Sequence, residues 1–243
     1  MPMQDTGNHE IIKLPLKNRV NAFLWFLHRL TGIVIIVWMT MHTFTNFLIL
    51  QGKEVYEQEV VLYHELVPQI DIFYAILGVV IAWHAFYGLT NIIRDLSGRS
   101  DSYNSPTRRV TKGFSSWFKN DRNLPTRPLW SIHRISALII LFTVFVHFVW
   151  IHLIGSYGYY SNWESVIETF KNPMWMLFYL LFDFGISFHG TQGIRIILTD
   201  FTGLGSRPER HKLILALSLF AGIIGFLVLA YIDVSAFLYV NSL

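Results

Sequence analysis

Long apolar stretches separated by short polar segments dominate the pattern of side chains along the chain. Five stretches lack Lys, Arg, Asp and Glu, apart from one aspartate in the fourth, and they cover residues 30–52, 72–93, 135–163, 172–194 and 213–232. About 20 apolar residues in a helix cross roughly 30 Å of hydrocarbon. A soluble fold would instead require several long buried helices without an amphipathic face. The pattern therefore predicts an all-α membrane protein with five transmembrane helices.

The start of the chain is polar and differs from the rest. Residues 1–20 are expected to form a cytoplasmic N-terminal segment, and residues 21–243 a single transmembrane domain. A cleaved signal peptide is not expected, because residues 1–19 are polar and no small-residue cleavage site follows the first apolar stretch. The chain contains no cysteine, which excludes disulfides, iron–sulfur ligation and thioether-linked haem on this chain.

Basic residues concentrate in alternate connections between the expected helices. Of 19 Lys and Arg residues, only Lys53 and Lys171 fall in the first and third connections. The positive-inside rule then predicts a cell (inner) membrane protein with its N-terminus in the cytoplasm and its C-terminus outside. The net charge of +3 reflects this topology rather than binding to nucleic acid, and the basic connection 94–127 is a candidate docking face.

The first two expected helices resemble the next two, displaced by 105 residues. The sequence around Trp25, His28 and Arg29 is echoed around Trp130, His133 and Arg134, and the same offset relates four further pairs: His42 and His147, His84 and His189, Gly88 and Gly193, and Asp95 and Asp200. Constant spacing across two helices predicts an internal repeat of two hairpins with the same orientation. The fifth helix has no counterpart, so we expect it to pack laterally against a four-helix bundle.

Four histidines lie inside the expected spans, one on each of the first four helices: His42, His84, His147 and His189. Ionisable residues inside a membrane are costly and indicate function. Structural histidines or a proton relay are alternatives, but one histidine per helix at repeat-related positions favours ligation of two non-covalent b haems.

Depth in the membrane predicts how these histidines pair. His42 and His147 lie late in helices that run outward, whereas His84 and His189 each lie 11 residues before an aspartate at the cytoplasmic edge. The four therefore form an inner pair, His84 with His189, and an outer pair, His42 with His147. At 1.5 Å per helical residue the two pairs are separated by on the order of 15 Å along the membrane normal.

Neighbouring residues are consistent with haem. Gly88 and Gly193 follow their histidines by four residues and share a helical face with them, where a flat macrocycle would approach the backbone. Close helix packing is the alternative role for these glycines. Four arginines at cytoplasmic helix ends are candidates to pair haem propionates, or else interfacial anchors: Arg29, Arg94, Arg134 and Arg195.

Two sequence motifs resemble those of a known family. Residues 28–32 (HRLTG) and 189–195 (HGTQGIR), followed by Asp200, resemble the membrane cytochrome b subunits of succinate dehydrogenases and fumarate reductases, and five helices in one chain resemble the single-chain class with two haems. The resemblance implies that His42 and His147 ligate a distal haem and His84 and His189 a proximal one.

The resemblance also implies partners. An iron–sulfur subunit and a flavoprotein subunit would dock on the cytoplasmic face, and succinate and fumarate chemistry would belong to the flavoprotein. This chain would be the membrane anchor and electron-transfer subunit of a succinate:quinone oxidoreductase, embedded in lipid and acting on menaquinone or ubiquinone. Some members carry a glutamate two residues before the fourth ligand, on which a transmembrane proton path would be built, but this chain has Ser187 there. The alternative carboxylates for such a path are Asp183, Glu57, Glu65 and Asp233.

Two groups of residues are candidates for binding quinone. Near the inner haem, the cytoplasmic ends of helices one and three offer hydrogen-bond donors: Trp25, His28, Arg29, Trp130, His133 and Arg134. Near the outer haem, Glu57 and Glu65 offer carboxylates that exchange protons. We favour the inner group.

Other interpretations stay open. His28 and His42 are 14 residues apart, as are His133 and His147, and this spacing is similar to that of bc-type cytochromes b, in which two histidines on each of two helices ligate two haems. The cytochrome b subunit of a hydrogenase, formate dehydrogenase or nitrate reductase is another redox alternative. The non-redox alternative is a small transporter that uses the histidines as proton carriers.

Overall fold

The computed structural model describes residues 16–66, 70–96, 127–149, 163–202 and 208–242. In these ranges every regular element is a helix: α1 (Leu16–Phe47), the 3-10 helix η1 (Leu48–Gln51), α2 (Lys53–Leu66), α3 (Ile70–Leu96), α4 (Arg127–Phe148), α5 (Trp163–Lys171), α6 (Pro173–Thr202) and α7 (Pro208–Val240). The N-terminal segment through residue 15 and most of the basic connection, residues 97–126, lie outside the described residues.

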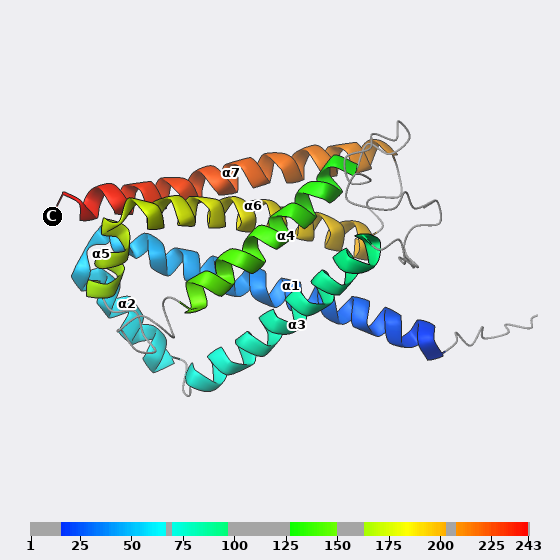
Figure 1. Cartoon of the computed structure of the whole chain (residues 1–243), viewed down its shortest axis with the longest axis horizontal. Coiled ribbons are helices and arrows are strands. Elements are labelled where there is room, and N and C mark those ends of the chain that lie inside the picture. The colour runs from blue at the N-terminus through cyan, green and yellow to red at the C-terminus, as the bar shows by residue number, and fades with distance from the viewer. Residues whose placement is uncertain (1–15, 67–69, 97–126, 150–162, 203–207, 243) are drawn as a thin grey trace, which may run out of the picture.

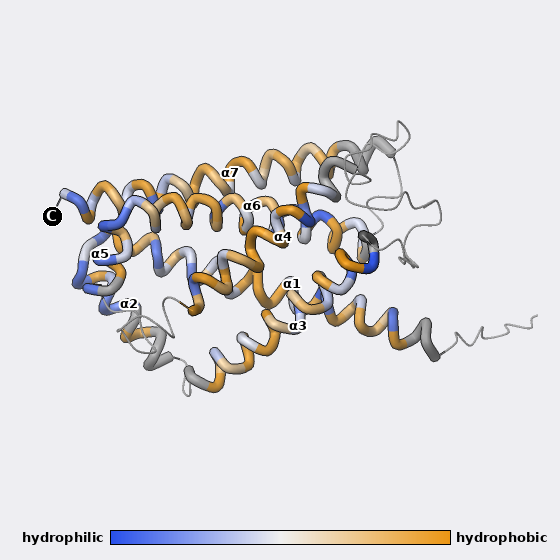
Figure 2. Tube along the Cα trace, viewed as in Figure 1, coloured by the Kyte–Doolittle hydropathy of each residue, from blue (hydrophilic) through white to orange (hydrophobic). Residues whose placement is uncertain are grey.

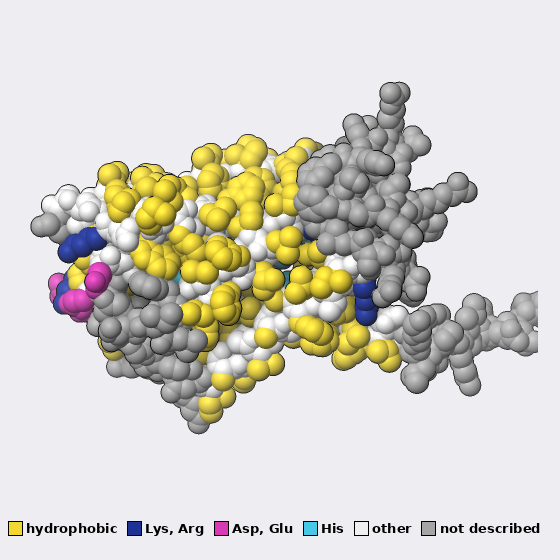
Figure 3. Space-filling view, in the orientation of Figure 1, with side chains coloured by type: hydrophobic (Ala, Val, Ile, Leu, Met, Phe, Trp, Pro, Cys, Tyr) yellow, Lys and Arg dark blue, Asp and Glu magenta, His cyan; other side chains and the backbone are white. Residues whose placement is uncertain are grey.

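Four helical segments are long and apolar enough to cross a membrane: Val20–Gln51, Ile72–Arg94, Ser131–Phe148 and Leu213–Val240. They expose large apolar side chains, for example Val79, Phe145 and Phe220, which are 71%, 65% and 64% accessible. An apolar belt covers the middle of the molecule, and charged side chains gather at its two ends (Figures 2 and 3). The structure is thus an all-α protein suited to a multi-pass membrane location.

The fourth expected span, residues 172–194, corresponds to α6 (Pro173–Thr202), which has 30 residues and is long enough to cross a bilayer. It carries buried polar side chains, among them Asp183, Ser187 and Gln192. A buried position between other helices explains how these side chains avoid lipid. α6 packs most extensively against α7 and α4, while α1 packs against α3 (Figure 1).

Glycines bring α6 close to its neighbours. A Cβ added to Gly185 would lie 2.9 Å from Cγ1 of Ile140 on α4, and one added to Gly222 on α7 would lie 3.0 Å from the Thr191 hydroxyl. Small residues at such contacts are the usual device for tight packing between membrane helices. α7 therefore packs closely along α6.

Hydropathy alone does not predict α2 and α5, which lie at one end of the bundle (Figure 1). α5 is amphipathic: Val166, Ile167 and Phe170 face a small apolar core, whereas Glu164 and Glu168 are exposed. That core joins η1, α2, α5 and α7, and its buried members are Ile49, Tyr56, Trp163, Phe170, Ala236 and Val240. Both helices therefore cap one end of the bundle rather than cross it.

An exposed ion pair joins these two capping helices. Lys53 Nζ donates a hydrogen bond to Glu164 Oε1 at 2.5 Å and lies 3.8 Å from Glu57 Oε1. The hydrogen bond raises the pKa of Lys53 and lowers the pKa of Glu164. The contribution of Glu164 to stability is therefore lost as the pH falls through its folded pKa, and that of Lys53 as the pH rises through its folded pKa.

The pair is expected to contribute little, because exposed ion pairs are screened by water and salt. Lys53→Met should lower the thermal unfolding temperature slightly at neutral pH and low salt. The difference from the wild type should vanish in high salt and also at acidic pH. A loss that persists in high salt would contradict a purely electrostatic contribution.

Candidate functional site

The inner pair of intramembrane histidines lies between α3 and α6. The ring centroids of His84 and His189 are 6.1 Å apart, and the ring planes are 88° to each other. A metal–imidazole bond is about 2.0 Å long, so two imidazoles on opposite sides of one metal ion have centroids roughly 6.3 Å apart. The spacing of this pair therefore suits one metal ion held between the two rings.

Backbone contacts fix the orientation of both inner rings. His84 Nδ1 lies 3.2 Å from the carbonyl oxygen of His28, and His189 Nδ1 lies 3.2 Å from the carbonyl oxygen of His133. A carbonyl oxygen only accepts hydrogen bonds, so each Nδ1 carries the proton and each Nε2 keeps its lone pair. This is the arrangement of metal-ligating histidines, whose second nitrogen donates to a backbone or carboxylate oxygen. The Thr31 hydroxyl lies a further 3.2 Å from His84 Nδ1.

His28 and His133 lie flat against the inner pair. The His28 and His84 rings stack with centroids 4.1 Å apart, and the His133 and His189 rings stack with centroids 4.3 Å apart. Nδ1 of both His28 and His133 is buried without a hydrogen-bond partner among the described residues. The backbone carbonyls of His28 and His133 therefore orient the His84 and His189 rings, while Nδ1 of each of their own rings is left to bond with another group.

The outer pair joins α1 and α4. The centroids of His42 and His147 are 6.4 Å apart with the ring planes at 70°, close to the same bis-imidazole spacing of roughly 6.3 Å. Trp38 stacks on His42 at 5.0 Å, and the Tyr179 hydroxyl lies 3.2 Å from His147 Nδ1. The outer pair therefore has nearly the spacing of the inner pair, and aromatic side chains contact both of its rings.

Both pairs suit haem better than a bare metal ion. Among the described residues, no group of three or more His, Asp or Glu side chains is placed to hold a metal ion. A haem needs only two axial protein donors, since the porphyrin supplies the other ligands. Each pair offers two such donors in an apolar bundle.

The glycines near the inner pair differ in how tightly they are packed. A Cβ on Gly88 would lie 3.6 Å from His28 Cε1, and one on Gly193 would lie 4.0 Å from His133 Cε1, both ordinary contacts. A Cβ on Gly32, however, would lie 3.1 Å from His84 Cε1. Gly32 is thus the glycine most closely fitted to an inner histidine, although the spacing argument singled out Gly88 and Gly193.

Gly32→Ala is expected to displace the His84 ring by a few tenths of an ångström. The haem proposed at the inner pair should then bind less tightly, with lower occupancy and an altered low-spin electron paramagnetic resonance signal. Gly78→Ala on α3 is the matched control, because nothing lies within 4 Å of the added Cβ; it should gain up to about 1 kcal/mol of helix propensity. Equal effects of the two substitutions would show that Gly32 has no special relation to His84.

The predicted arginines are divided between the inner site and the surface. Arg29 acts electrostatically on His28 and His84, and Arg195 acts on His133. Arg195 is 8% accessible and donates from Nε to Gln192 Oε1 at 2.8 Å. Arg134 is partly buried on α4, whereas Arg94 is exposed in the last turn of α3. Arg29 and Arg195 are therefore the arginines best placed near the inner histidines.

The inner quinone candidates include two buried nitrogen atoms without hydrogen-bond partners among the described residues. The Arg29 guanidinium lies 4.5 Å from the centre of the Trp25 ring. Trp25 Nε1, like His28 Nδ1, is buried and has no hydrogen-bond partner among the described residues. The side chain of Trp130 lies outside the described residues. A buried N–H without an acceptor is costly, so a carbonyl-bearing ligand would stabilise this position.

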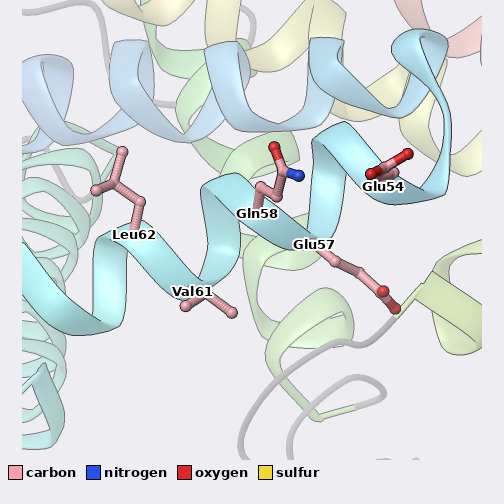
Figure 4. A pocket seen from close by; sticks show the side chains of 5 residues that line it. All are labelled: Glu54, Glu57, Gln58, Val61 and Leu62. Atoms are coloured by element: carbon pink, nitrogen blue, oxygen red, sulfur yellow. The ribbon is translucent and has the colours of Figure 1, made fainter.

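The outer quinone candidates lie on the capping helix α2. Glu57 borders a depression lined by side chains of this one helix: Glu54, Glu57, Gln58, Val61 and Leu62 (Figure 4). The side chain of Glu65 lies outside the described residues. The described part of this region offers a carboxylate near the bundle end, but no buried donor without a partner.

Together these features define a helical, multi-pass membrane protein with two facing histidine pairs inside its bundle. The chain belongs to the succinate dehydrogenase/fumarate reductase transmembrane subunit family, whose model matches residues 11–117 and 124–229. This confirms the family predicted from the sequence.

Two curated proteins are similar to part of the chain. One is a succinate dehydrogenase hydrophobic membrane anchor subunit from Thermoplasma acidophilum, 31% identical over 78 residues, which are 32% of this chain and 61% of that protein. The other is a succinate dehydrogenase 2 membrane subunit SdhC from Mycobacterium tuberculosis, 33% identical over 84 residues, 35% of this chain and 60% of that protein. The similarity thus spans about three fifths of each relative's length.

Proposed function

We propose that this chain is the membrane anchor and electron-transfer subunit of a succinate:quinone oxidoreductase, and that it passes electrons between an iron–sulfur subunit and a membrane quinone through two b haems. The observation that carries this proposal is the presence of two facing histidine pairs, with centroids 6.1 and 6.4 Å apart, inside an apolar helix bundle. Haem iron, when bound, supplies one-electron exchange between its ferric and ferrous forms.

In this proposal each group of residues has a separate role in holding the haems. His84 and His189 ligate the inner haem, and His42 and His147 the outer one. The carbonyls of His28 and His133 hold the inner imidazoles in the tautomer that ligates through Nε2. Arg29 and Arg195 lie near enough to the inner histidines to balance propionate charge. The apolar helices exclude water around both pairs.

We further propose five spans and an internal repeat for the single domain 21–243. The length of α6 supports counting it as a span in addition to the four most apolar segments. Equal contacts at an offset of 105 residues support the repeat: Nδ1 of His84 on α3 lies 3.2 Å from the His28 carbonyl on α1, and Nδ1 of His189 on α6 lies 3.2 Å from the His133 carbonyl on α4. The family model also matches two successive segments of similar length.

Orientation and partners complete the proposal. The end that carries α2, α5 and the C-terminus faces outside, and the end that carries Arg29, Arg94 and Arg195 faces the cytoplasm. An iron–sulfur subunit docks on this cytoplasmic face, followed by a flavoprotein that performs the succinate and fumarate chemistry. Electrostatic docking of this kind weakens with salt.

Purification of the assembled complex tests the function. In mild detergent at low salt, the chain is expected to co-purify with a flavin-bearing and a cluster-bearing subunit, and with about two haem b per chain by pyridine haemochrome assay. A colourless chain without partners would overturn the proposal and favour a transporter. A haem-bearing chain associated with other redox subunits would instead indicate a different quinone-linked complex.

A further inference from the structure

Two aspartates face each other inside the bundle, where the haem-ligation proposal assigns them no part. Asp183 of α6 is 7% accessible, and its carboxyl group hydrogen-bonds with that of Asp233 on α7. Among the described residues, the charged group that acts on each aspartate is the other aspartate. Two carboxylates this close in a low-dielectric interior do not both ionise. Their hydrogen bond requires that one of them carries a proton.

Asp183 begins a polar stripe along the face of α6 that packs on α7. Ser187 and Thr191 follow it at intervals of four residues and so lie along its helical face, and Arg195 lies one turn beyond Thr191. α7 presents small or polar residues to this stripe: Gly225 beside Ser187, Gly222 beside Thr191, and Ser218, which hydrogen-bonds with Gln192 at 3.2 Å. A polar seam therefore runs along the α6–α7 contact from the aspartates toward Arg195.

Helix association alone does not account for this seam. Polar residues that hold membrane helices together are themselves hydrogen-bonded. Ser187 Oγ, however, is buried with no hydrogen-bond partner among the described residues, and Ser187 is only 6% accessible. Four residues along a helix span about 6 Å, a gap that one bridging water molecule closes with two hydrogen bonds.

The opposite end of the seam is closed by side chains. Tyr179 lies one turn before Asp183, and Asp233 and Tyr56 both act on it electrostatically; its hydroxyl contacts His147. Beyond it, the capping core is tightly buried: Ile49, Tyr56, Ala236 and Val240 are 2%, 3%, 0% and 1% accessible. Among the described residues, the seam therefore continues with polar side chains only toward the Arg195 end.

We propose that Asp183 and Asp233 form a proton-binding site inside the membrane, which holds one proton between two carboxyl groups and exchanges it with water along the Ser187–Thr191 stripe of α6. Exchange moves one proton in for each proton out, so the pair keeps a single negative charge. The ligand is a proton, and the site is separate from the histidine pairs.

Infrared spectroscopy of the detergent-solubilised complex tests the site. At neutral pH we expect a carbonyl-stretching band from a buried, protonated carboxyl group. The band should shift in Asp183→Asn and in Asp233→Asn and be absent from the double variant. Glu54→Gln, an exposed carboxylate on α2, should leave it unchanged. Absence of the band from the wild type, or its persistence in the double variant, would overturn the proton-binding site.

The route is tested in a variant that keeps the aspartates. Ser187→Ala removes one hydroxyl from the stripe without adding bulk, so it should fold and keep the band but slow its shift in ²H₂O several-fold. Ser136→Ala, a buried serine on α4 that is 1% accessible, should exchange at the wild-type rate. An exchange rate unchanged by Ser187→Ala would refute the stripe as the route.

Discussion

Replacing His84 with alanine is expected to reduce the haem content of the assembled complex from about two per chain to about one, and His189→Ala should do the same. Either substitution would leave the haem proposed at the inner pair with one imidazole donor, because the remaining ring cannot span the 6.1 Å between the two centroids. Haem content by pyridine haemochrome and loss of one low-spin signal in electron paramagnetic resonance measure the effect.

His28→Ala is the matched control for this experiment. The His28 ring stacks on His84 at 4.1 Å, but the hydrogen bond that orients His84 comes to the backbone carbonyl of His28, which the substitution retains. Both haems should therefore remain. Loss of a haem in His28→Ala together with full haem content in His84→Ala would reverse the assignment and support the bc-type spacing of 14 residues.

The membrane-crossing helices could be predicted from the sequence, because each helix that crosses a bilayer needs an uninterrupted apolar stretch of sufficient length. Charged residues at the two ends of the stretch mark its limits. The stretches 30–52, 72–93 and 213–232 accordingly lie within α1–η1–α2, α3 and α7. α6 was harder to predict from hydropathy, because Asp183 and its polar neighbours are tolerated only through burial against α4 and α7.

The capping helices could not be predicted by the same rule. α2 and α5 lie in connections rich in charge, and their stability comes from packing against η1 and α7. The ion pair between Lys53 and Glu164 joins residues 111 positions apart, and nothing local in the sequence relates them. Tertiary contacts of this kind decide the structure of short amphipathic helices.

The sequence predicted which histidines lie opposite each other, but not which other residues contact them. Depth arguments paired His84 with His189 and His42 with His147, and the structure brings each pair together; ligation itself stays a prediction. Tyr179 was missed, because its contact with His147 on another helix leaves no periodic signal. Trp38 was also missed, although its spacing of four residues from His42 on α1 places both on one helical face. Gly32 lay in a quoted motif, but its contact with His84 depends on how closely α1 approaches α3.

A comparison of the two ends of the bundle leads us to predict that quinone binds at the inner end. The inner end holds Trp25 Nε1 and His28 Nδ1, both buried and without partners among the described residues, beside Arg29. The described part of the outer end offers Glu57, which lies 3.8 Å from Lys53. A quinone carbonyl accepts hydrogen bonds, so donors without acceptors favour the inner end.

Trp25→Phe and His28→Ala are therefore expected to slow quinone turnover while both haems remain. Each removes a hydrogen bond worth about 1–3 kcal/mol, which corresponds to roughly 5- to 150-fold in rate. Trp25→Phe is the sharper variant, because it keeps an aromatic ring under Arg29 and deletes only the indole N–H. Glu57→Gln and Glu65→Gln serve as the outer counterparts and should retain most turnover. Steady-state reduction of a soluble quinone analogue, normalised to haem content, gives the comparison. Loss of turnover confined to the two outer variants would place the quinone at the opposite end of the bundle.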